Sequence, residues 1–449
     1  MANSDVVVRA AQLESRSVRV YASCGGTIAM KTVILGGGIV GVATAYFLAK
    51  AGDEVTVIER NPGVALETSF ANAGLISPGH SYTWASPQAP KILIKSLFSD
   101  DQALRLKLIP DWRMYAWCLQ FLRNCTAARA RLNTSRKVHL SRYAQAQLDA
   151  VTAQEGLEYN RVSKGLLYLH RDQASLERAI ANMSILTDSG LTLLTLNKSE
   201  ILAREPALAR SGDQLVGAIF CPTDESGDAH VFTKSLYERC RRLGVKFDFN
   251  TTIQNVSASA DMIDYVETSN GRVTANRFVL AMGCYSPAFS RKLGYRLPVY
   301  PVKGYSVTYP VLDGCEPPDI GGLDEHNLIA WARFGNRLRF TATAEFAGFD
   351  TSHQPRDFAH MLQAARNLFP QGADYSQPKF WAGLRPMTPT GLPVLGAARH
   401  RNLFFNTGHG HLGWTWSCGT ARLIADLMHG RQPEIDTTGL TWPPRSRNL

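Results

Sequence analysis

Residues 32–59 read TVILGGGIVGVATAYFLAKAGDEVTVIE, and this stretch decides the fold. It starts as an apolar strand over 32–35, turns at three consecutive glycines, and continues as a helix with small and apolar residues at helical spacing. A second strand over 55–58 ends at Glu59. Because strand, helix and strand in this order form the βαβ unit of a parallel sheet, the stretch predicts an α/β fold with a Rossmann-like domain.

The glycine spacing in this turn predicts a dinucleotide site. Gly36, Gly38 and Gly41 form GxGxxG, in which the glycines allow a tight turn, a close backbone approach to a pyrophosphate and close helix packing. The helix start offers unpaired N–H groups to the anion, and Glu59 can accept from ribose hydroxyls. We expect cofactor contacts from Gly36, Gly38, Ile39, Val40, Gly41, Glu59 and Arg60. At this point both NAD and FAD remain open.

An uncharged run of 18 residues, 32–49, also reaches the length at which a transmembrane helix becomes arguable. Three glycines in a row would cost a helix backbone entropy, whereas they suit a turn. We therefore expect no membrane span here. Residues 1–29 lack the continuous apolar core of a secretory signal, and we expect a disordered N-terminal extension; a transit peptide or a leader stays open.

Composition is that of a globular protein of two or three domains. The chain has 449 residues, 45% hydrophobic and 19% charged, which excludes disorder and fibrous repeats. The net charge of +10 favours anionic partners without selecting among phosphates, substrates and lipids, and no nucleic-acid-binding motif accompanies it. Eight cysteines lack CxxC or zinc-site spacing, so we expect no metal, reduced thiols and a cytoplasmic location.

Two small-residue loops favour a flavin over a nicotinamide. Residues 67–75 follow the Glu59 strand, and residues 406–414 open a second helix near the end of the chain. Small side chains let the backbone approach a flat ring, and amides at a helix start can stabilise negative charge on a reduced flavin. Each loop alone could be an ordinary turn. Together with the first glycine motif they predict FAD.

The chain then resembles a known family, the small subunits of D-amino acid dehydrogenases, within the glycine and sarcosine oxidase superfamily. The resemblance runs from Met30 to about Arg431. Beside the first motif it rests on ALETSFANAGLISPG (65–79), DESGD (224–228), PVKGYS (301–306), FWAGLRPMTPTGLPVLG (380–396) and NTGHGHLGWT (406–415). Residues 1–29 lie outside the family pattern.

The resemblance implies a fold and a reaction. The expected FAD domain is discontinuous, over 30–85, 225–296 and 380–438, and a substrate domain with a mixed, largely antiparallel sheet occupies 86–224 and 297–379. The implied reaction is oxidative deamination of D-amino acids such as D-alanine to 2-oxo acids and ammonia, with electrons passed to a quinone or the respiratory chain. A glycine, sarcosine or D-hydroxyproline oxidising relative and a noncatalytic flavoprotein subunit are the alternatives.

The resemblance also implies functional residues, which we assign to positions of this sequence one at a time. Arg385 matches the arginine that holds the substrate carboxylate, which suits the bidentate guanidinium fork. Tyr305 and Arg333 are secondary candidates for the substrate cavity, whereas flavin amine oxidation needs no strong base from a histidine such as His80. No cysteine stands at the motif that carries covalent flavin in related enzymes, so FAD should be noncovalent. Further expected FAD contacts are Thr68, Ser69, Asn72, Ala73, Gly74, Leu75, Val256, Ala281, Gly283, Gly383, Gly408, His409, Gly410, His411, Leu412, Gly413 and Trp414.

Residues 91–142 are expected to be largely helical and mix Trp and Tyr with arginines. That mixture suits an anionic membrane surface, and the resemblance implies peripheral attachment to the bacterial inner membrane. The alternative is ordinary amphipathic helices with a solvated basic face.

Overall fold

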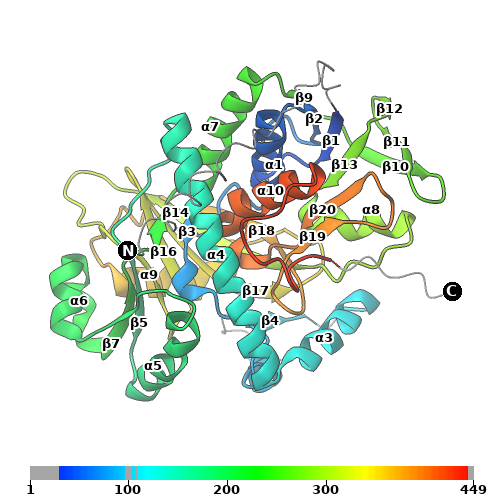
Figure 1. Cartoon of the computed structure of the whole chain (residues 1–449). Coiled ribbons are helices and arrows are strands. Elements are labelled where there is room, and N and C mark those ends of the chain that lie inside the picture. The colour runs from blue at the N-terminus through cyan, green and yellow to red at the C-terminus, as the bar shows by residue number, and fades with distance from the viewer. Residues whose placement is uncertain (1–29, 97–103, 108, 443–449) are drawn as a thin grey trace, which may run out of the picture.

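The structure, a computed structural model, describes residues 30–96, 104–107 and 109–442 (Figure 1). The N-terminal extension expected over 1–29 lies outside the described residues. Two large sheets organise the chain, one of six strands and one of nine. Both are built from segments far apart in the sequence, so the two sheets are interleaved along the chain.

The six-stranded sheet contains the predicted βαβ unit. Its strands run parallel except the first, which is antiparallel to its neighbour. Their order is β19 (Val394–Ala397), β20 (Leu403–Thr407), β13 (Arg277–Leu280), β1 (Lys31–Leu35), β2 (Glu54–Ile58) and β9 (Lys246–Asp248). The strand β13 is buried and lies in the interior of the sheet.

Both faces of this sheet are covered, as a parallel sheet requires. On one face its apolar residues pack against α1 (Ile39–Lys50), α4 (Ala127–Glu155), α7 (Ala229–Arg242) and α10 (Gly413–Met428). The other face packs against α8 (Ser286–Lys292) and a three-stranded sheet of β10 (Ile253–Ala258), β11 (Ile263–Thr268) and β12 (Gly271–Val273). The last two form the hairpin that the Asn270-Gly271 turn predicts.

The nine-stranded sheet is mixed and largely antiparallel. It runs β18 (Lys379–Met387), β14 (Tyr300–Pro310), β17 (Arg337–Phe346), β16 (Ile329–Phe334), β15 (Gly321–Asp324), β5 (Leu166–His170), β7 (Gly217–Cys221) and β6 (Leu194–Leu196), with β4 (Leu104–Leu106) beside β17. The helices α5 (Gln173–Thr187), α6 (Lys198–Arg204) and α9 (Ala359–Leu368) pack around it. A short pair, β3 (Leu75–Ile76) and β8 (Glu225–Ser226), stands apart.

Two of the expected domain boundaries differ from the structure. The strand β18 opens the third expected FAD segment, yet it pairs along its length with β14 in the nine-stranded sheet. The helix α4, expected in the substrate domain, packs its buried face mainly on α10. In both cases contacts with segments distant in the sequence decide the placement, and local sequence does not carry that information.

The region 91–142 is mostly helical, as expected, but contains one strand. It holds most of α2 (Ala89–Ser96), all of α3 (Trp112–Asn124) and the first half of α4, and β4 interrupts them. The strand forms because Leu104, Arg105 and Leu106 pair with the end of β17. Among helices of the described residues, none is long and apolar enough to cross a membrane.

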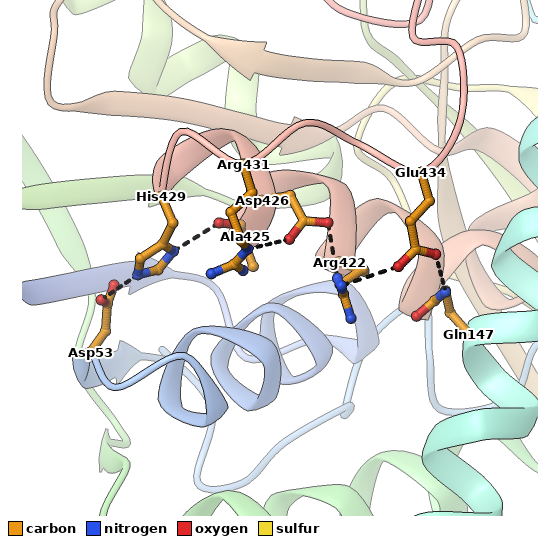
Figure 2. A network of polar contacts seen from close by, with 8 residues as sticks. All are labelled: Asp53, Gln147, Arg422, Ala425, Asp426, His429, Arg431 and Glu434. Carbon is orange, nitrogen blue, oxygen red and sulfur yellow. Dashed lines mark hydrogen bonds and ion pairs between the residues drawn. The ribbon is translucent and has the colours of Figure 1, made fainter. Parts of the chain in front are cut away.

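The helix α10 is held between α1 and α4, and Figure 1 shows the three helices side by side. Gly419 allows the close approach to α4, because a Cβ there would lie 2.5 Å from the Cβ of Ala144. At the C-terminal end, the buried Asp426 accepts from Arg422 (2.9 Å) and Arg431 (2.7 Å) (Figure 2).

Two further contacts extend this network to the neighbouring elements. His429 bonds to Asp53, just beyond α1, at 3.0 Å. Glu434 accepts from Arg422 at 3.2 Å and from Gln147 of α4 at 3.3 Å (Figure 2). The position of α10 is thus set at its C-terminal end and along its length.

The start of α1 depends on two glycines of the motif. Gly36 has a φ of +109°, and a Cβ there would lie 2.7 Å from the carbonyl oxygen of Ala281 on the neighbouring strand end. A Cβ on Gly41 would lie 1.9 Å from the Gly36 oxygen. The third glycine therefore serves the packing of helix on turn, as the motif predicts.

Replacing this third glycine should destabilise the domain. We expect Gly41→Ala to lower the free energy of unfolding by about 3 kcal/mol and to reduce FAD retention, because the new methyl meets backbone that cannot move alone. The control is Gly63→Ala, where a Cβ meets only Leu66 at 3.7 Å. Chemical denaturation and the bound FAD content of both variants check this. Equal stability of the two would contradict the assigned packing.

Candidate functional site

One cavity of about 1070 Å³ lies where the two sheets meet. This exceeds the roughly 300–1,000 Å³ common for small-molecule sites. Its lining includes the glycine turn, residues 65–75, the loop before β10, the end of β13, the strands β14, β17 and β18, and residues 406–414. The cavity therefore brings together both small-residue loops that the sequence singles out.

The end of the cavity beside α1 has the features of an anion-binding site. The helix begins at Ile39 with no acidic residue in its first turn and no side-chain cap on Gly38. One of its first N–H groups, that of Ile39, is met by the Ser69 hydroxyl at 3.3 Å. Gly38, Ile39 and Val40 line the cavity, so the positive end of the helix faces it.

Glu59 stands at the end of β2, as predicted, and is held rigidly. Its carboxylate accepts from the N–H of Gly37 at 2.7 Å and from the backbone and side chain of Asn61, both at 2.8 Å. A carboxylate has about four acceptor positions. One position thus remains for a hydroxyl, which suits the expected contact with ribose.

Residues next to Glu59 complete this end of the cavity, and the sequence analysis missed some of them. Arg60 lines it, pairs with Glu67 and lies over the Tyr285 ring at 3.9 Å from the centroid. Residues 251–254 also line it, whereas the expected Val256 packs into the core beneath the sheet. The reason is that β10 starts at Ile253 and carries the chain away from the cavity.

The first small-residue loop contacts the nine-stranded sheet. The Thr68 hydroxyl donates to the carbonyl of Leu384 at 2.7 Å, and Asn72 accepts from the N–H of Gly74 at 3.0 Å. Gly74 has a φ of +71°, and a Cβ there would overlap the Phe334 ring. Thr68, Ser69, Asn72, Ala73, Gly74 and Leu75 all line the cavity.

The second loop, 406–414, leaves three buried polar atoms without a partner among the described residues. They are Oδ1 of Asn406, Nε2 of His411 and Nε1 of Trp414, and all three residues line the cavity. His409 bonds to Thr420 at 3.0 Å, and burial lowers the pKa of His409 to about 3, so its ring is neutral. Gly408 is not in the lining; its φ of +73° shapes the turn.

These features fit FAD. An open helix start, a fixed ribose-binding carboxylate and unpartnered polar groups on a loop of small residues match a dinucleotide with a flat polar ring. The lining residues of 36–40, 59–61, 65–75, 251–254, 281–285 and 406–414 would hold it. Gly383 and the expected Ala281 and Gly283 belong to the same lining.

Two cysteines reach this cavity that the sequence analysis did not place there, Cys118 and Cys284. The thiol of Cys284 donates to the carbonyl of Leu384 at 3.5 Å, beside the motif around Arg385. Burial raises the pKa of both thiols. They are therefore protonated at neutral pH and are weak nucleophiles.

Arg385 points into the cavity from β18 without a counter-ion. It forms no ion pair with any described carboxylate, and the only acidic residues in the described lining, Glu59 and Glu67, belong to the dinucleotide end. Its guanidinium lies on Gly304, where a Cβ would come within 2.5 Å of it. Burial lowers the pKa of Arg385 to about 10, so the group stays charged at neutral pH.

The carbonyl of a residue with a strained backbone conformation orients this guanidinium. Nη1 of Arg385 donates to the carbonyl oxygen of Thr343 at 2.9 Å. Thr343 has a φ of +61° inside β17, at a register shift where the strand bulges opposite Gly304. A threonine in the left-handed region costs energy, and such strain gathers at functional sites. Among the described residues the bond to Thr343 is the one hydrogen bond of the guanidinium, so its other N–H groups can bind an anion in the cavity.

Of the two secondary candidates, Tyr305 lines the cavity and Arg333 does not. The Tyr305 hydroxyl is committed to the buried Glu345 at 2.5 Å, so the ring alone serves as a wall. Arg333 donates to the carbonyl of Gly335 and pairs with Asp319 at 3.3 Å. The expectation that Arg333 lines the cavity is wrong: Ala330 of β16 lines it, and Arg333, three residues further along the strand, lies on the opposite face of the sheet.

His80 is held at the cavity by the segment that contains DESGD. It bonds to Glu325 at 2.9 Å and stacks on Tyr168, whose hydroxyl donates to Asp224. Asp224 also accepts from the N–H of Gly79 at 2.9 Å, and burial raises the pKa of Asp224 to about 6. The motif thus fixes the position of the His80 loop.

Comparison with known sequences gives a family match over most of the chain. Residues 31–427 match the family described as "FAD dependent oxidoreductase". The chain is 44% identical over 414 residues to D-amino acid dehydrogenase 2 of Mesorhizobium japonicum, covering 92% of this chain and all of that protein. It is 46% identical to D-amino acid dehydrogenase of Methylobacterium nodulans, covering 90% and 97%.

Solved structures share the fold at low identity. Glycine oxidase from Geobacillus kaustophilus superposes with a TM-score of 0.70 at 23% identity, covering 94% of this chain and all of that one. L-alpha-glycerophosphate oxidase from Mycoplasma pneumoniae, with FAD bound, superposes with a TM-score of 0.67 at 17% identity, covering 92% and 99%.

Proposed function

We propose, since this chain belongs to the family of FAD-dependent oxidoreductases, that it oxidatively deaminates D-amino acids to 2-oxo acids and ammonia. The observation that carries the proposal is the half-buried guanidinium of Arg385, which has no ion-pair partner among the described residues and lines the cavity that fits FAD. A buried charge without a partner is costly, so a site that keeps one is built for an anionic ligand. Relatives of 44% and 46% identity named D-amino acid dehydrogenase support the choice of substrate.

Residues of this chain bind and orient the amino acid. Arg385 takes the carboxylate through parallel N–H bonds, which fixes both position and direction, and Thr343 keeps the fork in place. The ring of Tyr305 lines this part of the cavity. FAD, when bound, supplies the two-electron oxidation of the Cα–N bond, and water then converts the released imino acid to the 2-oxo acid.

The electrostatics at Arg385 favour an unprotonated substrate amine. No carboxylate of the described residues lines this end of the cavity, and burial together with Lys137, His80 and Arg385 holds the pKa of His411 well below its ordinary value. Nearby positive charge and low solvation likewise lower the pKa of a bound amine. The substrate can therefore react in its neutral form without a strong base from the protein.

The whole proposal is tested by the colour of the purified protein. We expect a yellow protein that releases all its FAD on acid precipitation, since both cavity thiols are protonated. Anaerobic addition of D-amino acids should bleach the flavin band, and L-amino acids should not. Reoxidation should be faster with a quinone than with oxygen. A flavin that no D-amino acid bleaches would contradict the proposal.

Arg385 and Arg333 provide a matched pair of variants. We expect Arg385→Ala to lower kcat/KM at least ~100-fold, or about 3 kcal/mol, mainly through KM, with FAD content unchanged. Arg333→Ala should leave the kinetics as they are, because that side chain is outside the cavity. Steady-state assays with D-alanine decide the matter. Equal effects of the two changes would refute the carboxylate site at Arg385.

We further propose that the electron acceptor is a membrane quinone and that the protein sits in the cytoplasm, peripherally on the bacterial inner membrane. The outer face of α3 supports this: four large apolar side chains recur there at helical spacing, and Trp112 is 83% exposed. We call Trp112, Tyr115, Leu119 and Leu122 the α3 stripe. The helix lies at the outer edge of the molecule (Figure 1).

Charge around the α3 stripe matches an anionic lipid surface. Residues 112–148 contain six arginines and no acidic residue, and their one lysine, Lys137, is fully buried. Arg113, Arg123, Arg129 and Arg131 are exposed. Aromatic and aliphatic groups beside cations are the pattern of helices that lie in a membrane interface.

Vesicle binding tests the α3 stripe. We expect the holoprotein to sediment with phosphatidylglycerol vesicles and not with phosphatidylcholine vesicles. A double variant that combines Trp112→Glu and Leu119→Glu, the stripe variant, should bind at least ~10-fold more weakly, because it loses two apolar groups and gains two negative charges. Leu312→Glu, at another exposed leucine, serves as control. Binding that the stripe variant retains would exclude this face as the membrane contact.

A further inference from the structure

The cavity has a second compartment that the FAD-binding loops do not account for. It lies between the helices α2 and α3 and the part of the nine-stranded sheet that contains β17 and β4, and we call it the apolar arm. Its described lining residues are Trp84, Ala89, Leu93, Leu104, Trp117, Cys118, Phe121 and Phe346. None of them carries a charge, and the Cys118 thiol is kept protonated because burial raises its pKa.

The apolar arm begins next to Arg385. The indole N–H of Trp117 donates to the carbonyl of Met387, two residues along β18 from Arg385, at 3.0 Å. Phe346 lies three residues beyond Thr343 on β17, and its ring centroid is 5.5 Å from that of Trp117. The same two strands that hold the guanidinium and its acceptor therefore also hold the arm.

A third wall connects the arm to the second FAD-binding loop. Trp84 stacks on His411 with 5.1 Å between ring centroids and 16° between planes. Trp117 in turn stacks on Phe121, at 5.3 Å and 14°. Aromatic rings therefore line the arm on two sides, and Trp84 joins it to the second FAD-binding loop.

We propose that the apolar arm receives the side chain of the amino acid, so that large apolar and aromatic amino acids are the preferred substrates. This rests on the proposed function and adds the substrate class. A phenyl, indole or long aliphatic group loses its water there and meets aromatic faces. A charged side chain would find no partner among the described lining of the arm, and a methyl group would leave most of it unfilled.

The size of the preference follows from how much of the arm a smaller side chain leaves empty. Each missing methylene in a hydrophobic pocket costs about 10- to 200-fold in kcat/KM. We therefore expect D-phenylalanine, D-leucine and D-methionine to exceed D-alanine in kcat/KM by at least ~10-fold, and D-aspartate to be the poorest of the series.

Two variants of α3 localise the effect. Cys118→Trp fills the arm from its inner wall, whereas Gln120→Trp places the same residue on the exposed side of the helix. The first should lower kcat/KM for D-phenylalanine at least ~10-fold more than kcat/KM for D-alanine. The second should change neither. Cys118→Leu is a smaller filling change, should the tryptophan prevent folding, and FAD content reports folding in each case.

A binding measurement does not depend on turnover. We expect 3-phenylpropionate to perturb the flavin absorbance of the wild type at concentrations at least ~10-fold lower than propionate, and this difference should vanish in Cys118→Trp. Both ligands offer Arg385 the same carboxylate, so the difference reports the arm alone.

The possible results separate the inference from the function it rests on. Flavin bleaching by D-alanine as fast as by D-phenylalanine, with equal affinities for the two carboxylates, overturns the assignment of the arm and leaves the proposed function standing. A Cys118→Trp variant that raises KM for a quinone but keeps the amino acid preference shows that the arm belongs to the acceptor, and also overturns it. If no amino acid bleaches the flavin, the proposed function fails, and the inference fails with it.

Discussion

The packing of α1 against α10 is the constraint on which the rest of the structure depends. The two helices come from opposite ends of the chain, yet both start at one cavity, and their contact sets the distance between the two glycine-lined starts. The buried amide of Asn406 donates to the hydroxyl of Thr44 at 2.9 Å and ties the second loop to the first helix. Gly41 at one end and the Asp426 network at the other hold this pair in place.

The nine-stranded sheet, in contrast, contains two features that lower the stability of the folded protein. A guanidinium without a carboxylate partner among the described residues and a threonine with a φ of +61° both destabilise the protein taken alone. They stand next to each other on β18 and β17, and extensive strand pairing on either side holds them there. This is how a site can keep a charge ready for a ligand, because the surrounding sheet supplies the stability that the site lacks.

The helix α3 connects the inside of the cavity to the surface. Its inner face contributes Trp117, Cys118 and Phe121 to the apolar arm, and its outer face carries the α3 stripe. Exposed apolar side chains beside Arg113 and Arg123 are unusual on the outer face of a surface helix, which is normally polar. In the two proposals made above, this one short helix takes part in both substrate choice and membrane contact.

Local spacing in the sequence determined the first βαβ unit, the glycine turn and the place of Glu59, because each depends on residues fewer than ~30 positions apart within one motif. Arg385 and the two small-residue loops, which the sequence analysis also singles out, line one cavity, although Arg385 came from a resemblance and not from spacing.

Only the tertiary structure decided what depends on strand register between distant segments. It placed β18 in the nine-stranded sheet, removed Arg333 and Val256 from the cavity lining, and put 251–254 in the lining instead. It also created the apolar arm from α2, β4, α3 and β17, none of which shows its cavity-facing side in its own sequence. A one-residue change of register moves a side chain to the other face of a sheet, and register is set by partners hundreds of residues away.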